Sequence, residues 1–311
     1  MSVFCMFSNT SYKDYINSSL YEEIKDFPDQ WFGTKYEDTP DDSIVIFDAI
    51  IPKNYVKSSR TFIVKTNDVH YFNNDMRDAI IYTYTVADYI LGPYTDTVKT
   101  LYNIPEEKLI LVPHSAPLKF QISAIKEDPI PKIFFFGASN STHYPLREGF
   151  IKRMKDSENF VRLEHPGYES KKSESSELLK NYICSYTSGA FPKFEIPEGN
   201  HSHYLVTKFF EIMCSGVLLL TDDSSVITQL ANLGLHAGVH YIYSETEKLD
   251  DAIAYILNPE NRLTVNSIRK SGWELCMKEH TSKVRCAQII ERIIKISKKK
   301  IVIRKDEINS F

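Results

Sequence analysis

Lys208 and Glu211 are the pair of residues whose types and spacing best fit the binding of a charged ligand. They stand three positions apart in a segment of helical pattern, so their side chains share one helix face. A helix N-terminus and an ammonium group attract phosphate, while a carboxylate accepts hydrogen bonds from hydroxyl groups. The pair therefore fits a ligand with phosphate and hydroxyl groups. The same spacing also fits an exposed ion pair, and spacing alone favours that simpler interpretation.

Small or polar residues follow two predicted buried strands. Gly137 and Ala138 follow the strand Lys132–Phe136, and Thr187 follows the strand Asn181–Tyr186. Ligands of parallel sheets lie outside the carboxyl ends of the strands, so these residues are candidates for the same site. A glycine lets the backbone approach a phosphate, although it serves an ordinary tight turn equally well.

Asp222 and Asp223 follow a further buried strand, Val217–Thr221. Polar groups at this strand end could hold a base or a sugar. The alternative is a capping role for Asp223 or Ser224 at the start of the next helix, and we favour Ser224 as the cap.

Asp68 and His70 are the candidates for acid–base chemistry in the first half of the chain. They follow the strand Arg60–Lys65 and stand two positions apart, so an extended chain places them on one side. Asp68 alone, or His70 polarised by Asp68, could take a proton from a hydroxyl group. A surface aspartate beside a hydrogen-bonded turn histidine fits nearly as well. His114 is a second candidate, or a hinge residue.

The elements that would position these residues form two successive sets of short strands and helices, the pattern of parallel sheets covered by helices. In the first half we expect strands at Val3–Phe7, Ser43–Ile50, Arg60–Lys65, Tyr89–Gly92 and Lys108–Pro113, with helices at Asn73–Ala87 and Thr95–Tyr102. In the second half we expect the three strands above, further strands at Phe160–Leu163 and Tyr241–Tyr243, and helices at Lys248–Leu257, Asn261–Glu279 and Thr281–Ser297.

The stretch Ser115–Ile130 interrupts the pattern with Pro117, Pro129 and mixed charge, and is interpreted as a linker. We therefore predict an α/β protein with two doubly wound parallel-sheet domains, residues 1–120 and 121–311. The polar stretch Ser170–Ser176 is interpreted as a surface loop.

Composition excludes several classes of protein. Lys and Arg number 37 against 41 Asp and Glu, so no global field favours nucleic acid. No apolar run approaches the roughly 20 residues of a membrane span. Five scattered cysteines indicate reduced, mostly buried thiols, and we expect a cytoplasmic protein. We find no metal-ligand cluster and expect no metal or other cofactor; the oligomeric state stays open.

The segment from Lys208 to Gly216 resembles the donor-site signature of GT-B glycosyltransferases of the family-4-like and CgeB-like branches. The matching residues are Lys208, Glu211, Ile212, Met213, Ser215 and Gly216. A weaker similarity covers Phe134–Ser139, as the first strand and loop of a donor domain, and Tyr144–Arg147. Arg147 could also be a solvated helix residue.

The resemblance implies a GT-B fold: two Rossmann-like domains facing a cleft, with the last helix packed back on the N-terminal domain. It implies a glycosyltransferase that moves a sugar from a UDP- or GDP-sugar to a glycan or other hydroxyl acceptor without a metal. Glu211 would bind the ribose and Lys208 would lie near the diphosphate. Gly137, Ala138, Arg147, Thr187 and His203 complete the expected donor site, and Asp68 or His70 in the N-terminal domain would be the base.

One position departs from the family pattern. Retaining family-4 enzymes usually carry a second glutamate eight residues before the matched one, and this sequence has His203 there. The stereochemical outcome therefore cannot be carried over. Two alternatives follow: a non-catalytic module that binds a nucleotide sugar, and a GT-B nucleotide-sugar epimerase. A tandem flavodoxin-like signalling protein is a third, supported only by the acidic pair Asp222 and Asp223.

Overall fold

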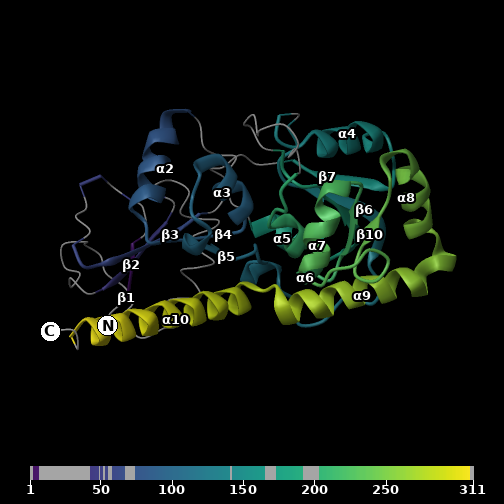
Figure 1. The fold of residues 1–311 in the computed structure, drawn as a ribbon. Coiled ribbons are helices and arrows are strands. Elements are labelled where there is room, and N and C mark those ends of the chain that lie inside the picture. Colours follow the sequence, from purple (N-terminus) through teal and green to yellow (C-terminus); the bar gives the residue numbers. More distant parts are fainter. Residues whose placement is uncertain are drawn as a thin grey trace. The chain divides into compact units, whose positions relative to one another are not determined.

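The structure is a computed structural model of the 311-residue chain, and it describes residues 3–6, 43–48, 50–51, 53–54, 58–66, 74–140, 142–164, 173–191 and 203–308. Asp68 and His70 lie outside these residues. The chain divides into two compact units, of which unit 1 comprises Met1–Pro113 with Ser282–Phe311 and unit 2 comprises His114–Thr281. Each unit contains a five-stranded parallel sheet with helices packed beside it (Figure 1).

Unit 1 is a sheet whose described strands run in chain order, β1-β2-β3-β4-β5. The last helix, α10, belongs to this unit: Cys286, Ile289, Ile293 and Ile296 lie in one core cluster with Ile44, Ile46, Ile63 and Leu91 of the sheet. Their spacing places one apolar helix stripe against the sheet. The elements are β1 (Val3–Met6), β2 (Ile44–Asp48), β3 (Thr61–Lys65), α2 (Asn74–Val86), β4 (Tyr89–Gly92), α3 (Thr95–Tyr102), η4 (Glu106–Lys108), β5 (Leu109–Leu111) and α10 (Ser282–Ile308).

Unit 2 has the strand order β10-β9-β8-β6-β7. Its elements are η5 (Leu118–Phe120), β6 (Ile130–Phe136), α4 (Pro145–Met154), β7 (Phe160–Leu163), α5 (Ser173–Leu179), β8 (Tyr182–Tyr186), α6 (Lys208–Cys214), β9 (Leu218–Thr221), η6 (Ser224–Val226), α7 (Ile227–Asn232), β10 (Ile242–Tyr243), η7 (Thr246–Lys248), α8 (Leu249–Leu257), η8 (Pro259–Asn261) and α9 (Arg262–Glu279). The chain passes from β6 to the edge strand β7 and then returns to β8 on the other side of β6. Strand order therefore reverses between β6 and β8, and ligands of doubly wound sheets bind outside such a switch point.

The aromatic run of β6 is explained by burial on both faces of the sheet. Phe134 and Phe136 belong to one core cluster with α6, while Ile133 and Phe135 belong to a second cluster with α4 and α8. Successive residues of a strand point to opposite faces, so a strand covered on both sides is apolar at every position. The predicted α/β fold with two Rossmann-like parallel sheets is confirmed.

Two local predictions were wrong. The polar stretch interpreted as a surface loop enters helix α5 at Ser173, because the fully buried Leu179 anchors the segment in the core. The predicted linker is also packed against unit 2: the Ser215 hydroxyl donates to the Phe120 carbonyl, and the Ile122 amide donates to the Cys214 carbonyl. The structure divides the chain after Pro113, ahead of the boundary that we predicted after residue 120.

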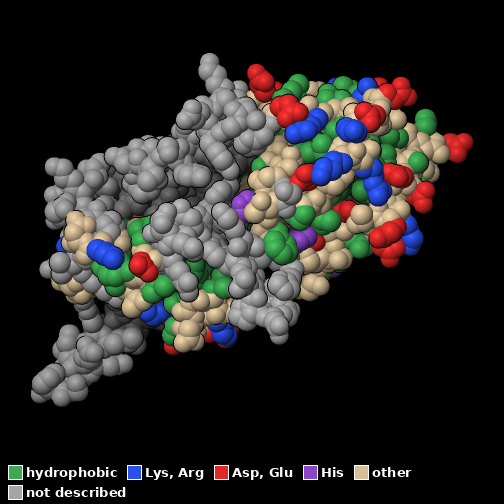
Figure 2. Space-filling model, turned by 90° about the horizontal axis from the view of Figure 1, so that it is seen from above, with side chains coloured by type: hydrophobic (Ala, Val, Ile, Leu, Met, Phe, Trp, Pro, Cys, Tyr) green, Lys and Arg blue, Asp and Glu red, His purple; other side chains and the backbone are tan. Residues whose placement is uncertain are grey.

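The described surface carries both signs of charge, and four cysteines are buried, as the composition predicts. On the face shown in Figure 2, basic and acidic side chains of the described residues are interspersed. Cys184, Cys214, Cys276 and Cys286 are buried free thiols. Among the helices that the structure describes, none is long and apolar enough to cross a membrane.

Gly216→Ala tests the packing of the linker on α6. Gly216 has φ +65°, and a Cβ there would lie 2.7 Å from Ile122 Cδ1 and 2.8 Å from Ile125 Cγ2. We expect Gly216→Ala to lower the free energy of unfolding by about 1–3 kcal/mol, through backbone strain and overpacking. Gly149→Ala is the matched control, because Gly149 lies in α4 with no atom within 4 Å of its Cβ position. It should raise stability by about 0.5–1 kcal/mol. Urea denaturation of both variants measures the difference, and equal effects would contradict the packing argument.

Candidate functional site

The predicted residues Gly137 and Lys208 meet at the switch point of unit 2. Gly137 directly follows β6 and has φ +101°, a conformation that favours glycine. A Cβ at Gly137 would lie 3.1 Å from Lys208 Cε and 3.3 Å from Lys208 Nζ, so the lysine side chain lies directly against the glycine. The glycine therefore serves both the turn and the close approach of the Lys208 ammonium group to the end of β6.

Lys208 and Glu211 form a buried ion pair on α6. Lys208 Nζ lies 2.9 Å from Glu211 Oε2, and the side chains are 13% and 0% exposed. Lys208 Nζ also lies 3.7 Å from the ring centroid of Phe136, a cation–π contact. Burial lowers the pKa of Lys208, and the pairing with Glu211 offsets only part of this effect. The interpretation as an exposed surface pair was wrong, because the aromatic end of β6 and the core beneath α6 enclose both groups.

Arg147 is buried and fastens two strand ends together. Its Nη1 donates to the Ala138 carbonyl at 3.2 Å and its Nη2 donates to the Ser188 carbonyl at 2.7 Å. The guanidinium also lies 4.0 Å from the ring centroid of Tyr144. Burial lowers the pKa of Arg147 despite these neighbours. The alternative interpretation as a solvated helix residue was wrong: Arg147 is 2% exposed and links the loop after β6 to the loop after β8.

Thr187 lies at the same strand-end edge of the unit 2 sheet, and its backbone is held by the neighbouring strand β9. Its amide donates to the Leu220 carbonyl of β9, and its side chain is buried with Oγ1 3.4 Å from the Ser188 carbonyl. Ala138 supplies a carbonyl to Arg147 and is partly buried. These two residues therefore shape the loops through their backbones.

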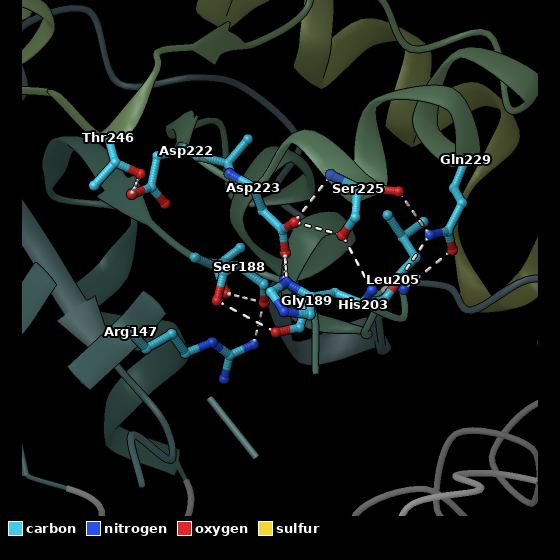
Figure 3. A network of polar contacts seen from close by, with 12 residues as sticks. Arg147, Ser188, Gly189, His203, Leu205, Asp222, Asp223, Ser225, Gln229 and Thr246 are labelled. Carbon is cyan, nitrogen blue, oxygen red and sulfur yellow. Dashed lines mark hydrogen bonds and ion pairs between the residues drawn. The ribbon is translucent and has the colours of Figure 1, made fainter. Parts of the chain in front are cut away.

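Asp223 connects three separate segments of unit 2 (Figure 3). Its Oδ2 accepts from the Gly189 amide at 2.9 Å and lies 2.6 Å from His203 Nδ1, while its Oδ1 accepts from the Ser225 amide and hydroxyl at 3.1 and 2.6 Å. Burial alone would raise the pKa of Asp223, but hydrogen bonds from His203 and Ser225 outweigh it and lower the pKa. The carboxylate therefore ties the end of β8, the segment before α6 and the end of β9 to one point.

The neighbouring Asp222 has a different environment. It accepts hydrogen bonds from the Tyr186 hydroxyl at 2.5 Å and from the Thr246 hydroxyl at 2.9 Å. Burial raises its pKa, in part against these hydrogen bonds. The sequence did not predict that Asp222 and Asp223 have different partners. It favoured Ser224 as the helix cap, whereas Asp223 is the N-cap of η6, since its carboxylate reaches the Ser225 amide.

The remaining predicted candidates are distributed as follows. His114 lies beside α6, with Nδ1 3.4 Å from the hydroxyl of its N-cap residue Thr207. Asp68 and His70 lie outside the described residues, so their role as a base stays a prediction. Among the residues that the structure describes, no group of three or more His, Cys, Asp or Glu side chains is placed to hold a metal ion.

Two further cations act on Lys208 through their charge. Arg147 and Lys119 each add to the lowering of the Lys208 pKa through their charge, after the larger effect of burial. Sequence reasoning missed Lys119, which lies in η5 with Nζ 5.4 Å from the Phe120 ring; Phe120 in turn packs against Phe136 beneath Lys208. A buried lysine at a switch point, with further cations acting on it, can hold an anionic ligand.

Comparisons with known proteins find one similar family and a shared fold. Residues 177–291 match a family model described as glycosyl transferase-like, and the matched segment contains Lys208 and Glu211. Over these residues the chain is similar to glycosyl transferases. The GT-B fold predicted from the sequence is confirmed by solved structures that share it. A search of curated protein sequences gave no match.

Solved structures of low sequence identity share the fold of this GT-B protein. HepE of Anabaena, crystallised with UDP and glucose, matches with a TM-score of 0.62 at 8% identity, over 95% of this chain and 100% of its own. A glycosyltransferase of Rickettsia africae matches with a TM-score of 0.55 at 10% identity, over 82% of this chain and 77% of its own. Sucrose-phosphate synthase of Thermosynechococcus elongatus matches with a TM-score of 0.53 at 9% identity, over 82% of this chain and 74% of its own.

Asp223→Asn tests the linking role of the Asp223 carboxylate through the pH dependence of stability. The folded-state pKa of Asp223 is lowered, so its contribution is present above the ordinary pKa of 3.8 and is lost as pH falls through the folded value. We expect Asp223→Asn to reduce the free energy of unfolding by about 1–3 kcal/mol at pH 7, and the difference from the parent chain to shrink below about pH 4.

Denaturation at a series of pH values measures this effect. Asp250→Asn is the control, because the Asp250 side chain is 73% exposed and pairs with Arg153 at the surface. It should change stability by less than about 1 kcal/mol at every pH. A pH-independent effect of Asp223→Asn would contradict the assignment.

Proposed function

We propose that this GT-B protein transfers a sugar from a nucleotide-diphosphate sugar to a hydroxyl group of a glycan or other acceptor. The observation that carries the proposal is the position of Lys208, which lies against Gly137 at the switch point and pairs with the buried Glu211. Diphosphates bind at such strand ends, where backbone amides and cations meet. In the transfer, negative charge develops on the leaving diphosphate, and Lys208 and Arg147 would stabilise it.

An exchange of partners would let this site accept a nucleotide. Glu211 is fully buried and paired with Lys208, whose side chain keeps 13% of its surface exposed. A diphosphate would draw the Lys208 ammonium group toward itself, and ribose hydroxyls would replace it as donors to the Glu211 carboxylate. Both charges keep a partner throughout, so the exchange avoids the large cost of an isolated buried charge.

A UDP-sugar is the favoured donor in this proposal. HepE, which shares the fold over nearly the whole chain, was crystallised with UDP and with UDP-glucose. The reaction is proposed to proceed without a bound metal, because Lys208, Arg147 and Lys119 supply the positive charge around the site. Gly137, Ala138 and Thr187 complete the proposed donor site, with His203 on the side of the donor sugar.

Titration calorimetry with UDP tests the proposal. Lys208→Met and Glu211→Gln should each weaken UDP binding by about tenfold or more, since each removes a charged partner of the nucleotide. Lys152→Met and Glu148→Gln are matched controls, because these residues form an ion pair on α4 whose lysine side chain is 72% exposed. Unchanged UDP affinity in the Lys208 and Glu211 variants, with folding intact by circular dichroism, would overturn the site assignment.

Turnover distinguishes the remaining alternatives. A transferase should hydrolyse its donor slowly in the absence of an acceptor, releasing UDP from UDP-glucose, UDP-N-acetylglucosamine or another nucleotide sugar. Binding of the donor without any release would identify a non-catalytic module. Conversion of the donor alone into its epimer would identify an epimerase.

A further inference from the structure

His203 and Asp223 form a dyad of the kind that moves protons. His203 Nδ1 lies 2.6 Å from Asp223 Oδ2, and the His203 amide donates to the Ser225 hydroxyl at 3.0 Å. A carboxylate that accepts the Nδ1 proton fixes the imidazole tautomer and leaves Nε2 as a proton acceptor. Among the described residues the ring's hydrogen bond is the one at Nδ1, and the His203 side chain keeps 15% of its surface exposed.

The dyad is held more firmly than a surface pair. Asp223 is 2% exposed and is fixed by the Gly189 amide and by Ser225, while the His203 ring lies edge-on to Phe191 with ring centroids 5.6 Å apart. A Cβ on Gly189 would lie 2.8 Å from His203 Cβ, so the glycine lets the end of β8 approach the histidine. Three segments of the chain therefore fix the position of the His203 ring (Figure 3).

The dyad also lies at the proposed donor site. The end of β8 that contacts Asp223 is the end that Arg147 holds through the Ser188 carbonyl, and α6 with Lys208 begins shortly after His203. Among the described residues, the charged side chain in contact with the His203 ring is Asp223. The cation Arg147 lies beside the loop after β8, where it donates to the Ser188 carbonyl. Ser225, Gln229 and Phe191, the other neighbours, do not titrate in the neutral range.

We propose that His203, oriented by Asp223, is the general base of the transfer reaction. Nε2 takes the proton of the attacking hydroxyl as its oxygen forms a bond to C1 of the sugar. The bond between C1 and the diphosphate oxygen breaks, and its electron pair leaves with the diphosphate, beside Lys208 and Arg147. The proton then passes from Nε2 to solvent. This assignment rests on the proposed function, and it places the base on unit 2 instead of on Asp68 or His70.

The pH dependence of donor hydrolysis tests the dyad, with water as the attacking hydroxyl. The full chain is screened with UDP-glucose, UDP-N-acetylglucosamine and GDP-mannose, and the donor that is hydrolysed fastest is used. We expect kcat to fall toward acid pH in the parent chain, because the base must be neutral. His203→Gln should lower kcat by about 10²–10⁴-fold, flatten the acid limb of the profile and leave the Kd for UDP within about threefold. Asp223→Asn should lower kcat by less and keep an acid limb.

Two further variants separate the dyad from other histidines. His236→Gln is the matched control, since His236 is exposed on unit 2 and contacts His240; it should leave kcat and the pH profile unchanged. If His70→Gln removes the acid limb and His203→Gln does not, the assignment to His203 is wrong. Loss of UDP affinity in His203→Gln in parallel with kcat would show a binding role only and would also overturn it. If the parent chain neither binds UDP nor hydrolyses any of the three donors, the proposed function fails and the dyad assignment fails with it.

Discussion

A buried carboxylate must keep a cationic partner, and much of unit 2 is arranged around this requirement. Glu211 is completely enclosed and Lys208 is its cationic partner, and the Lys208 side chain in turn needs the space that Gly137 leaves at the end of β6. Phe136 offers its ring face to the same ammonium group. Removing Lys208 would leave the Glu211 charge in the interior without its partner, which costs several kcal/mol.

The same arrangement prepares the pair for a ligand. An ammonium group whose pKa is lowered by burial gains from a second anion, and a carboxylate paired with a lysine can take hydroxyl donors in its place. The fold brings this pair to the reversal of strand order between β6 and β8, where Arg147 joins the two loops. Stability and binding therefore depend on one cluster of charges.

Asp223 has the corresponding role at the ends of β8 and β9. It is at once the N-cap of η6, the acceptor for the Gly189 amide and the partner of His203. Asp222, the next residue along the chain, faces Tyr186 and Thr246 instead. Two adjacent carboxylates thus have pKa values shifted in opposite directions, a pattern that accompanies a division of acid–base roles.

The alternation of apolar runs and helical patterns was enough to predict the α/β class and most strands of both sheets. Burial on both faces makes parallel strands such as Ile130–Phe136 apolar throughout, and this signal is local. The Lys208–Gly216 motif was also local, because three-residue helix spacing places its charged residues together. By contrast, the helix at Ser173–Leu179 was missed, since its apolar residues lie only at its end.

What the sequence determined by itself was therefore the set of elements, the donor-side motif and the class of enzyme it resembles. Only the tertiary structure decided which of its polar residues work together. Burial turned the Lys208–Glu211 pair from an apparent surface contact into an enclosed one, and Arg147 from a solvated residue into a link between loops. His203 and Asp223 are twenty residues apart and carry no joint pattern. The parallel sheet sets the ends of β8 and β9 at one edge, and the bridge between Ala190 and Tyr204 holds the segment with His203 against the end of β8.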